Sequence, residues 1–107
     1  MTVLRNKQCA EGVALIEGDI CRTVPEFVEK NPDFRISLLN LDVDIYEPSV
    51  IVLEHLFPLI EHGGVLILDD YESFPGETKA ADDYFASTPW AIIPSSENPS
   101  IHYVVKT

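Results

Sequence analysis

Basic residues are scarce in this sequence. The 107-residue chain has seven Lys plus Arg against eighteen Asp plus Glu, a formal net charge of −11 at pH 7. A surface with so much negative charge repels phosphate backbones and anionic lipid headgroups. We therefore expect that the protein binds neither nucleic acid nor a membrane.

Long apolar segments are also absent. No uninterrupted apolar run exceeds four residues, whereas a membrane-spanning helix needs about 20. Within the first ten residues, the polar segment 5–8 lies where a secretory signal would need its apolar stretch. The two cysteines, Cys9 and Cys21, lack the spacing of a zinc knuckle or a disulfide framework. These absences predict a cytoplasmic protein.

The composition is that of one folded domain. Apolar residues make up 46% and charged residues 23% of the chain, which is ordinary usage for a globular protein. A length of 107 residues is enough for one core and too short for two. We expect a single domain over residues 1–107.

Short apolar segments alternate with amphipathic ones, which is typical of an α/β fold. The pattern predicts strands at 13–16, 36–45 and 65–68, helices at 23–30, 48–62 and 77–87, and a closing antiparallel hairpin from 91–93 and 101–105. Pro25 suits the first turn of the first helix. Gly63 and Gly64 are expected to end the second helix, and Pro58 to kink it.

Acidic side chains follow two of the predicted strands. Asp42 and Asp44 close the second strand, and Asp69 and Asp70 close the third. Ligands bind at the carboxyl ends of parallel strands, and carboxylates gathered there repel one another unless a cation lies among them. Oxygen ligands favour magnesium, manganese or calcium over zinc, and of these we favour magnesium. The alternative is that these acids only cap helices or begin turns.

The stretches that carry these acids are familiar. Segments 39–49 and 63–71, Pro75-Gly76 and segment 81–85 resemble the macrocin O-methyltransferase (TylF-type) family. These are S-adenosylmethionine-dependent class I methyltransferases that modify sugar hydroxyls in natural-product pathways. The resemblance covers roughly residues 12 to 85 and implies a Rossmann-like sheet of three parallel strands with crossover helices, closed by a C-terminal antiparallel hairpin.

The resemblance also implies roles for particular residues. Asp42, Asp69 and Asp70 match the magnesium carboxylates of the family, and Asp42 also serves as general base. Segment 18–20, which is Gly18, Asp19 and Ile20, lies where the fold contacts the adenine of S-adenosylmethionine. The expected reaction is methyl transfer to a hydroxyl of a small-molecule acceptor, a sugar or small natural product, with magnesium lowering the pKa of that hydroxyl.

One part of the family pattern is missing. The first two strands and the Gly-rich loop should precede residue 13, and the five glycines of the chain cannot form such a loop. We therefore interpret the chain as the carboxyl-terminal half of a methyltransferase domain, a truncated domain. The strand at 36–45 then has an uncovered edge, which predicts a homo-oligomer formed through that edge.

Two alternatives remain open. The chain is either this methyltransferase fragment or a non-catalytic half-domain that binds a partner subunit. A magnesium-dependent phosphatase-like protein is a weaker alternative, because Asp42 and Asp44 mimic its Asp-x-Asp pair. The short separation between Asp44 and Asp69 leaves no room for the lysine segment and cap of such a phosphatase.

Overall fold

The computed structural model describes residues 16–69, 71–98 and 100–107. In chain order the elements are α1 (Ile20–Lys30), β1 (Ile36–Leu41), α2 (Tyr46–Leu56), the 3-10 turn η3 (Phe57–Leu59), β2 (Ile60–Leu68), α3 (Pro75–Phe85), β3 (Ile93–Pro94) and β4 (His102–Val105). Within these described ranges no helix is long and apolar enough to cross a membrane. The predicted strand at 13–16 lies outside them except for Ile16, which is in neither a helix nor a strand.

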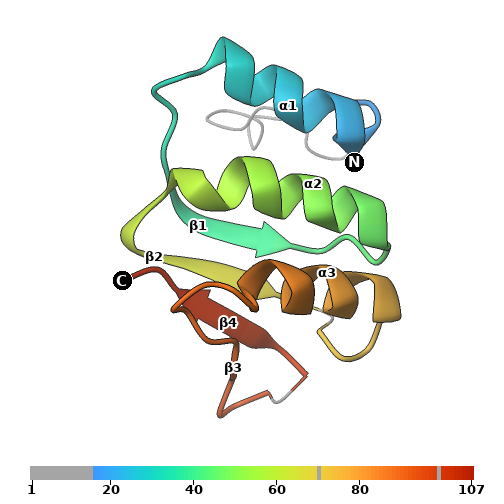
Figure 1. Ribbon diagram of the computed structural model, residues 1–107, viewed down its shortest axis with the longest axis vertical. Helices are drawn as coiled ribbons and strands as arrows, with labels where there is room; N and C mark the ends of the chain where they lie inside the picture. Colours follow the sequence, from blue (N-terminus) through green and yellow to red (C-terminus); the bar gives the residue numbers. More distant parts are fainter. Residues whose placement is uncertain (1–15, 70, 99) are drawn as a thin grey trace, which may run out of the picture.

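The four strands form one mixed sheet in the order β1-β2-β4-β3. β1 and β2 are parallel, whereas β4 runs antiparallel to both β2 and β3. The three helices lie on one side of this sheet (Figure 1). The predicted α/β class and the closing antiparallel hairpin are confirmed, and the described residues contain two of the three expected parallel strands.

The first helix begins earlier than predicted. α1 starts at Ile20 rather than at residue 23, because Asp19 caps it: an Oδ1 atom of Asp19 accepts a hydrogen bond of 2.9 Å from the amide of Cys21. Such a cap satisfies one of the free amides at a helix start. Pro25 therefore lies inside the helix and not in its first turn.

The second helix ends earlier than predicted. The expected helix at 48–62 is wrong beyond Leu56, where the chain enters the 3-10 turn and then β2. Pro58 lies in that turn, consistent with its inability to donate a helical hydrogen bond. The other predicted helix, at 77–87, is observed as Pro75–Phe85, and the predicted strand at 36–45 ends at Leu41.

Gly63 and Gly64 lie inside β2 and do not stop a helix. The register with β1 shifts across the segment that contains them, from Ile36 opposite Ile60 to Leu38 opposite Val65. A Cβ atom on Gly64 would lie 2.5 Å from Cγ2 of Ile60, and Gly63 has a φ of +87°. Both positions need glycine because β2 bulges here and its backbone approaches its neighbours closely.

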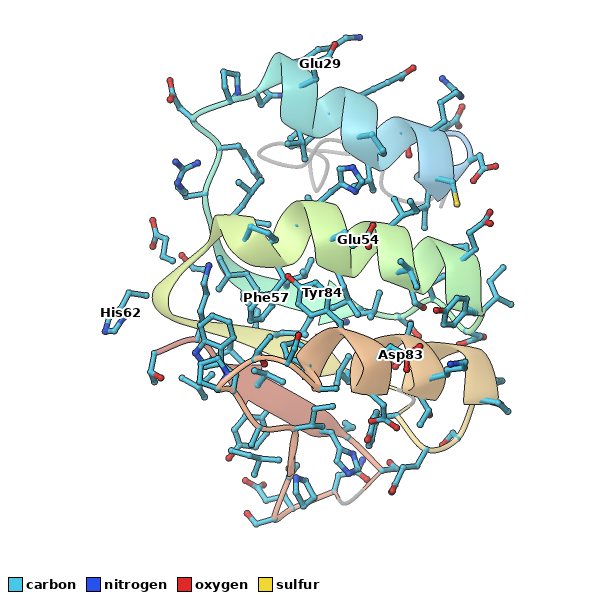
Figure 2. All side chains as sticks on the ribbon, viewed as in Figure 1. Glu29, Glu54, Phe57, His62, Asp83 and Tyr84 are labelled. Carbon is cyan, nitrogen blue, oxygen red and sulfur yellow. The ribbon has the colours of Figure 1, made fainter. Side chains whose placement is uncertain are left out.

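The core lies between the helices and one face of the sheet. Phe57 is 1% exposed, and the rings of Tyr84, Phe85 and Trp90 meet it edge-on with centroids 5.0 to 5.7 Å away. Figure 2 shows Phe57 and Tyr84 close together between α2 and α3. On the sheet, the buried side chains facing this cluster include Leu41, Leu66, Leu68 and Val104. This single core fixes the strands whose ends carry the acids.

Lys106 connects the end of β4 to the corner between α2 and β2. Its Nζ donates hydrogen bonds to the carbonyl oxygens of Phe57, Pro58 and Ile60 at 3.3, 3.0 and 2.9 Å. The same ammonium lies 5.4 Å from the centroid of the Phe57 ring. A cation here satisfies carbonyls that the end of a helix leaves free.

β1 has an open outer edge in the part of the chain that the structure describes, because it stands at the end of the strand order. Leu38 on this strand is 60% exposed. A groove of about 630 Å³ lies beside it between α1 and β1, lined mostly by apolar side chains such as Val24, Phe27 and Leu39.

Candidate functional site

The carboxyl ends of β1 and β2 meet at one edge of the sheet. Leu41 pairs with Leu68 across the two parallel strands, and the amide of Asp69 donates a hydrogen bond of 3.3 Å to the carbonyl oxygen of Leu41. Asp42 and Asp69 therefore occupy neighbouring positions, one residue beyond each strand. Asp42 is exposed and Asp69 half-buried, so this carboxylate pair is accessible to a ligand.

The loop after Asp42 is held by a buried serine. Ser49, in the first turns of α2, is fully buried. Its hydroxyl lies 2.9 Å from the carbonyl oxygen of Val43 and 2.8 Å from that of Ile45, and donates to them. Asp44 lies between these two anchored residues and is exposed. The loop that carries the acids of β1 is thus fixed by α2.

The start of α3 also packs on this loop. A Cβ atom on Gly76 would lie 2.6 Å from the amide nitrogen of Tyr46 and 2.9 Å from the carbonyl oxygen of Asp44. Only glycine permits so close an approach. The next residue, Glu77, is 0% exposed. The sequence analysis placed Glu77 only at the start of a predicted helix. Its position directly after Pro75-Gly76, a segment shared with the family, is the signal that places it next to the loop after Asp42.

Two of the three predicted magnesium carboxylates are described. Asp42 and Asp69 are brought together, while Asp70 lies outside the described residues. Within 16–69, 71–98 and 100–107, no group of three or more His, Cys, Asp or Glu is placed to hold a metal. The oxygen donors of the described pair fit a hard divalent cation, but a pair alone is not a complete site. The magnesium site stays a prediction.

Segment 18–20 forms the entry to α1. Gly18 has a φ of +130°, and the carbonyl oxygen of Asp19 accepts hydrogen bonds from the amides of Arg22 and Thr23 at 2.9 and 2.8 Å. Asp19 thus has a structural role as a helix cap, which the sequence analysis did not assign. The predicted contact of this segment with adenine stays a prediction.

A thiol joins this entry to the start of α2. Cys21 Sγ donates to Oε1 of Glu47 over 3.7 Å. Because α2 begins soon after the end of β1, this contact places the entry to α1 beside the loop that follows Asp42. Desolvation, together with the negative charges of Asp19 and Glu47, raises the pKa of the Cys21 thiol.

The residues after the acidic doublet form a second polar cluster. The Tyr71 hydroxyl donates to Oδ1 of Asp82. Burial and this hydrogen bond raise the pKa of Tyr71 to about 12. The Tyr71 ring also lies 4.6 Å from the ring of His102, centroid to centroid. The contact between Tyr71 and His102 depends on the pairing of β2 with β4, which no local sequence pattern reveals.

The chain matches the family described as "Macrocin-O-methyltransferase (TylF)" over residues 7–89. This chain belongs to the TylF family. It is 42% identical over 40 residues to the 8-demethyl-8-(2,3-dimethoxy-alpha-L-rhamnosyl)-tetracenomycin-C 4'-O-methyltransferase of Streptomyces olivaceus. The aligned stretch covers 37% of this chain and 15% of that protein. It is 37% identical over 55 residues to the demethyldecarbamoylnovobiocin O-methyltransferase of Streptomyces niveus, and this alignment covers 51% of this chain and 21% of that protein.

Solved structures of two methyltransferases resemble this TylF-family chain. CalS11, a calicheamicin methyltransferase, matches with a TM-score of 0.75 and 31% identity over 85% of this chain and 36% of that one. NovP, an O-methyltransferase, matches with a TM-score of 0.62 and 29% identity, over 68% of this chain and 30% of the NovP chain. The chain therefore spans less than half the length of these relatives. The predicted family and methyltransferase fold are confirmed.

Proposed function

We propose that this chain supplies the acceptor-side edge of an S-adenosylmethionine-dependent O-methyltransferase that acts on a hydroxyl of a sugar or small natural product. The observation that carries the proposal is the pairing of Asp42 with Asp69 beyond two adjacent parallel strands in a chain of the TylF family. A sugar hydroxyl is supported by the relatives, since one is named for a rhamnosyl substrate and CalS11 is described as a TDP-rhamnose 3'-O-methyltransferase.

The proposed chemistry assigns a proton acceptor. Magnesium held by Asp42, Asp69 and Asp70 would lower the pKa of the acceptor hydroxyl. The exposed carboxylate of Asp42 takes the hydroxyl proton as general base. S-adenosylmethionine, when bound, would supply the methyl group to the acceptor oxygen, with S-adenosylhomocysteine as the leaving group. The backbone amide of Asp69 is hydrogen-bonded to β1, so this residue is held beside Asp42 at this edge of the sheet, where the acceptor would be oriented.

Segment 18–20 is the proposed contact for the adenine of S-adenosylmethionine. Support comes from the contact between Cys21 and Glu47, which places the start of α1 beside the start of α2 and therefore near Asp42. Gly18 is exposed, and its lack of a Cβ allows a ligand to approach the backbone there closely.

A second copy of the chain is the proposed partner at the outer edge of β1. An open strand edge readily pairs with another strand. The exposed Leu38 and the apolar groove beside it add apolar surface, and burying that surface in an interface is favourable. The alternative function, a non-catalytic half-domain that binds a different subunit, would use the same edge. Binding of S-adenosylmethionine separates the two functions.

The test is calorimetry of the chain with S-adenosylmethionine, with and without magnesium. We expect binding in the micromolar range that is lost in Asp19→Ala and retained in Asp33→Ala, the same substitution at an exposed acid in the turn before β1. No heat with either ligand contradicts the methyltransferase proposal and favours the half-domain. Circular dichroism of the Asp19→Ala variant checks that loss of the helix cap has not unfolded the chain.

A further inference from the structure

We propose that His102 is a positioning residue for the loop formed by residues 71–74, which follows the acidic doublet. The inference rests on the proposed function only in that this loop borders the acceptor site. Its evidence is a set of contacts that joins β4 to the loop, and none of those contacts involves a ligand.

The sheet fixes the position of His102. It is the first residue of β4 and pairs with Leu68, the last residue of β2. Its exposed fraction is 7%, so its ring has little freedom. One nitrogen, Nε2, lies 3.8 Å from Oε1 of Glu72, and the ring face lies against Tyr71. A single side chain of β4 thus contacts both residues that follow Asp70.

Packing alone does not account for a histidine here. The other nitrogen, Nδ1, is buried and has no hydrogen-bond partner among the residues that the structure describes. A buried polar atom left in this state costs free energy, so an apolar side chain would fill the space at lower cost. Nε2 lies 3.8 Å from the Glu72 carboxylate, and this polar contact is what a histidine offers here and an apolar side chain does not.

The loop needs such a contact because its backbone is strained. Glu72 has a φ of +73°, a conformation uncommon for any residue but glycine. Its amide donates a hydrogen bond of 2.7 Å to Oγ1 of Thr78. This bond, the His102 contact and the Tyr71 hydrogen bond to Asp82 together hold the two residues next to the doublet. Contacts of this kind orient the carboxylates of a site.

The test is hydrogen exchange at the Glu72 amide in the ligand-free chain. We expect exchange about tenfold faster in His102→Leu, which removes Nε2. In His102→Gln, where the side-chain amide places a donor near the Nε2 position, we expect exchange close to that of the unmodified chain. Exchange at Leu66, in the centre of β2, should not change in either variant and serves as the internal control.

Two outcomes overturn the inference. Unchanged exchange at Glu72 in His102→Leu shows that the histidine does not hold the loop. Equally fast exchange in the Leu and Gln variants shows that the ring only fills space. If His102→Leu does not fold, Glu72→Ala removes the same contact from a side chain that is 70% exposed and not part of the core. It should speed exchange at the amide of residue 72 and shift the ring nitrogen resonances of His102, and the absence of both changes contradicts the proposal.

These measurements do not depend on methyl transfer. Loss of S-adenosylmethionine binding in the unmodified chain with the expected exchange pattern contradicts the proposed function alone. Binding of S-adenosylmethionine without the exchange pattern contradicts the role of His102 alone.

Discussion

The amide of Asp69 and the carbonyl oxygen of Leu41 form a hydrogen bond of 3.3 Å that extends the ladder between β1 and β2 one residue beyond the last strand pair. Backbone pairing thus sets the spacing of Asp42 and Asp69 before any ligand arrives. Two negative charges held in this way repel each other, and a divalent cation relieves the repulsion. From this relationship follow the first two predictions.

Replacing both members of the doublet, Asp69→Asn with Asp70→Asn, should abolish magnesium binding at millimolar concentrations. The amide side chains keep the shape of the acids and remove their charge. Calorimetry with magnesium, or electron paramagnetic resonance with manganese, measures the loss. Asp33→Asn serves as the control and should bind as the unmodified chain does. Unchanged affinity in the double variant would remove the metal from the mechanism.

Gly76→Ala should destabilise the fold by about 1–3 kcal/mol, because the new Cβ overpacks a backbone contact that cannot move freely. It should also weaken magnesium binding, since the loop after Asp42 must shift. Denaturant unfolding measures the first effect and calorimetry the second. Gly63→Ala separates strain from contact, because its Cβ would meet nothing within 4 Å. It should cost about 1–2 kcal/mol through its positive φ and leave magnesium binding unchanged.

The Tyr71 hydroxyl should lose its proton at a higher pH in the folded chain than in the unfolded chain. Its pKa is raised from 10.0 to about 12, so the folded state holds the phenol proton more tightly than the unfolded state. The stabilisation is fully present below pH 10 and is lost as pH rises toward 12. Phenolate absorbance should show one of the four tyrosines ionising near pH 12. That phase should disappear in Tyr71→Phe, and its persistence there would assign it to another tyrosine.

The edge of β1 should mediate self-association. A lysine at position 38 places a charge on the open edge, which natural sheets use to block pairing. We expect Leu38→Lys to convert a dimer or larger assembly to a monomer by light scattering at micromolar concentration. Ile45→Lys, at a similarly exposed apolar residue away from this strand, should leave the assembly intact. A monomeric unmodified chain contradicts the prediction.

The placement of Asp42 and Asp69 could be predicted from the sequence because it depends on one rule, that the ends of adjacent parallel strands meet. The boundary between α2 and β2 could not. The helical spacing of apolar residues continues through Ile60, and the local sequence around Gly63 and Gly64 does not reveal that the backbone of β1 lies within contact distance.

The helix cap at Asp19 and the contact of His102 with Glu72 were not predicted from the sequence, for different reasons. Asp19 precedes a helical pattern and carried an N-cap signal, but it was assigned to the cofactor loop alone. The contact of His102 with Glu72 joins residues of different elements and depends on the register between β2 and β4, which no local pattern contains. Long-range register is the information that a single sequence supplies least.

The three hydrogen bonds from Lys106 have a consequence for how the chain matures. The carbonyl oxygens at the corner between α2 and β2 obtain their counter-charge from a residue more than forty positions later. During synthesis that corner stays incomplete until the segment with Lys106 has left the ribosome. The parallel pair can form earlier, but the turn that leads into β2 is completed only after Lys106 has been made.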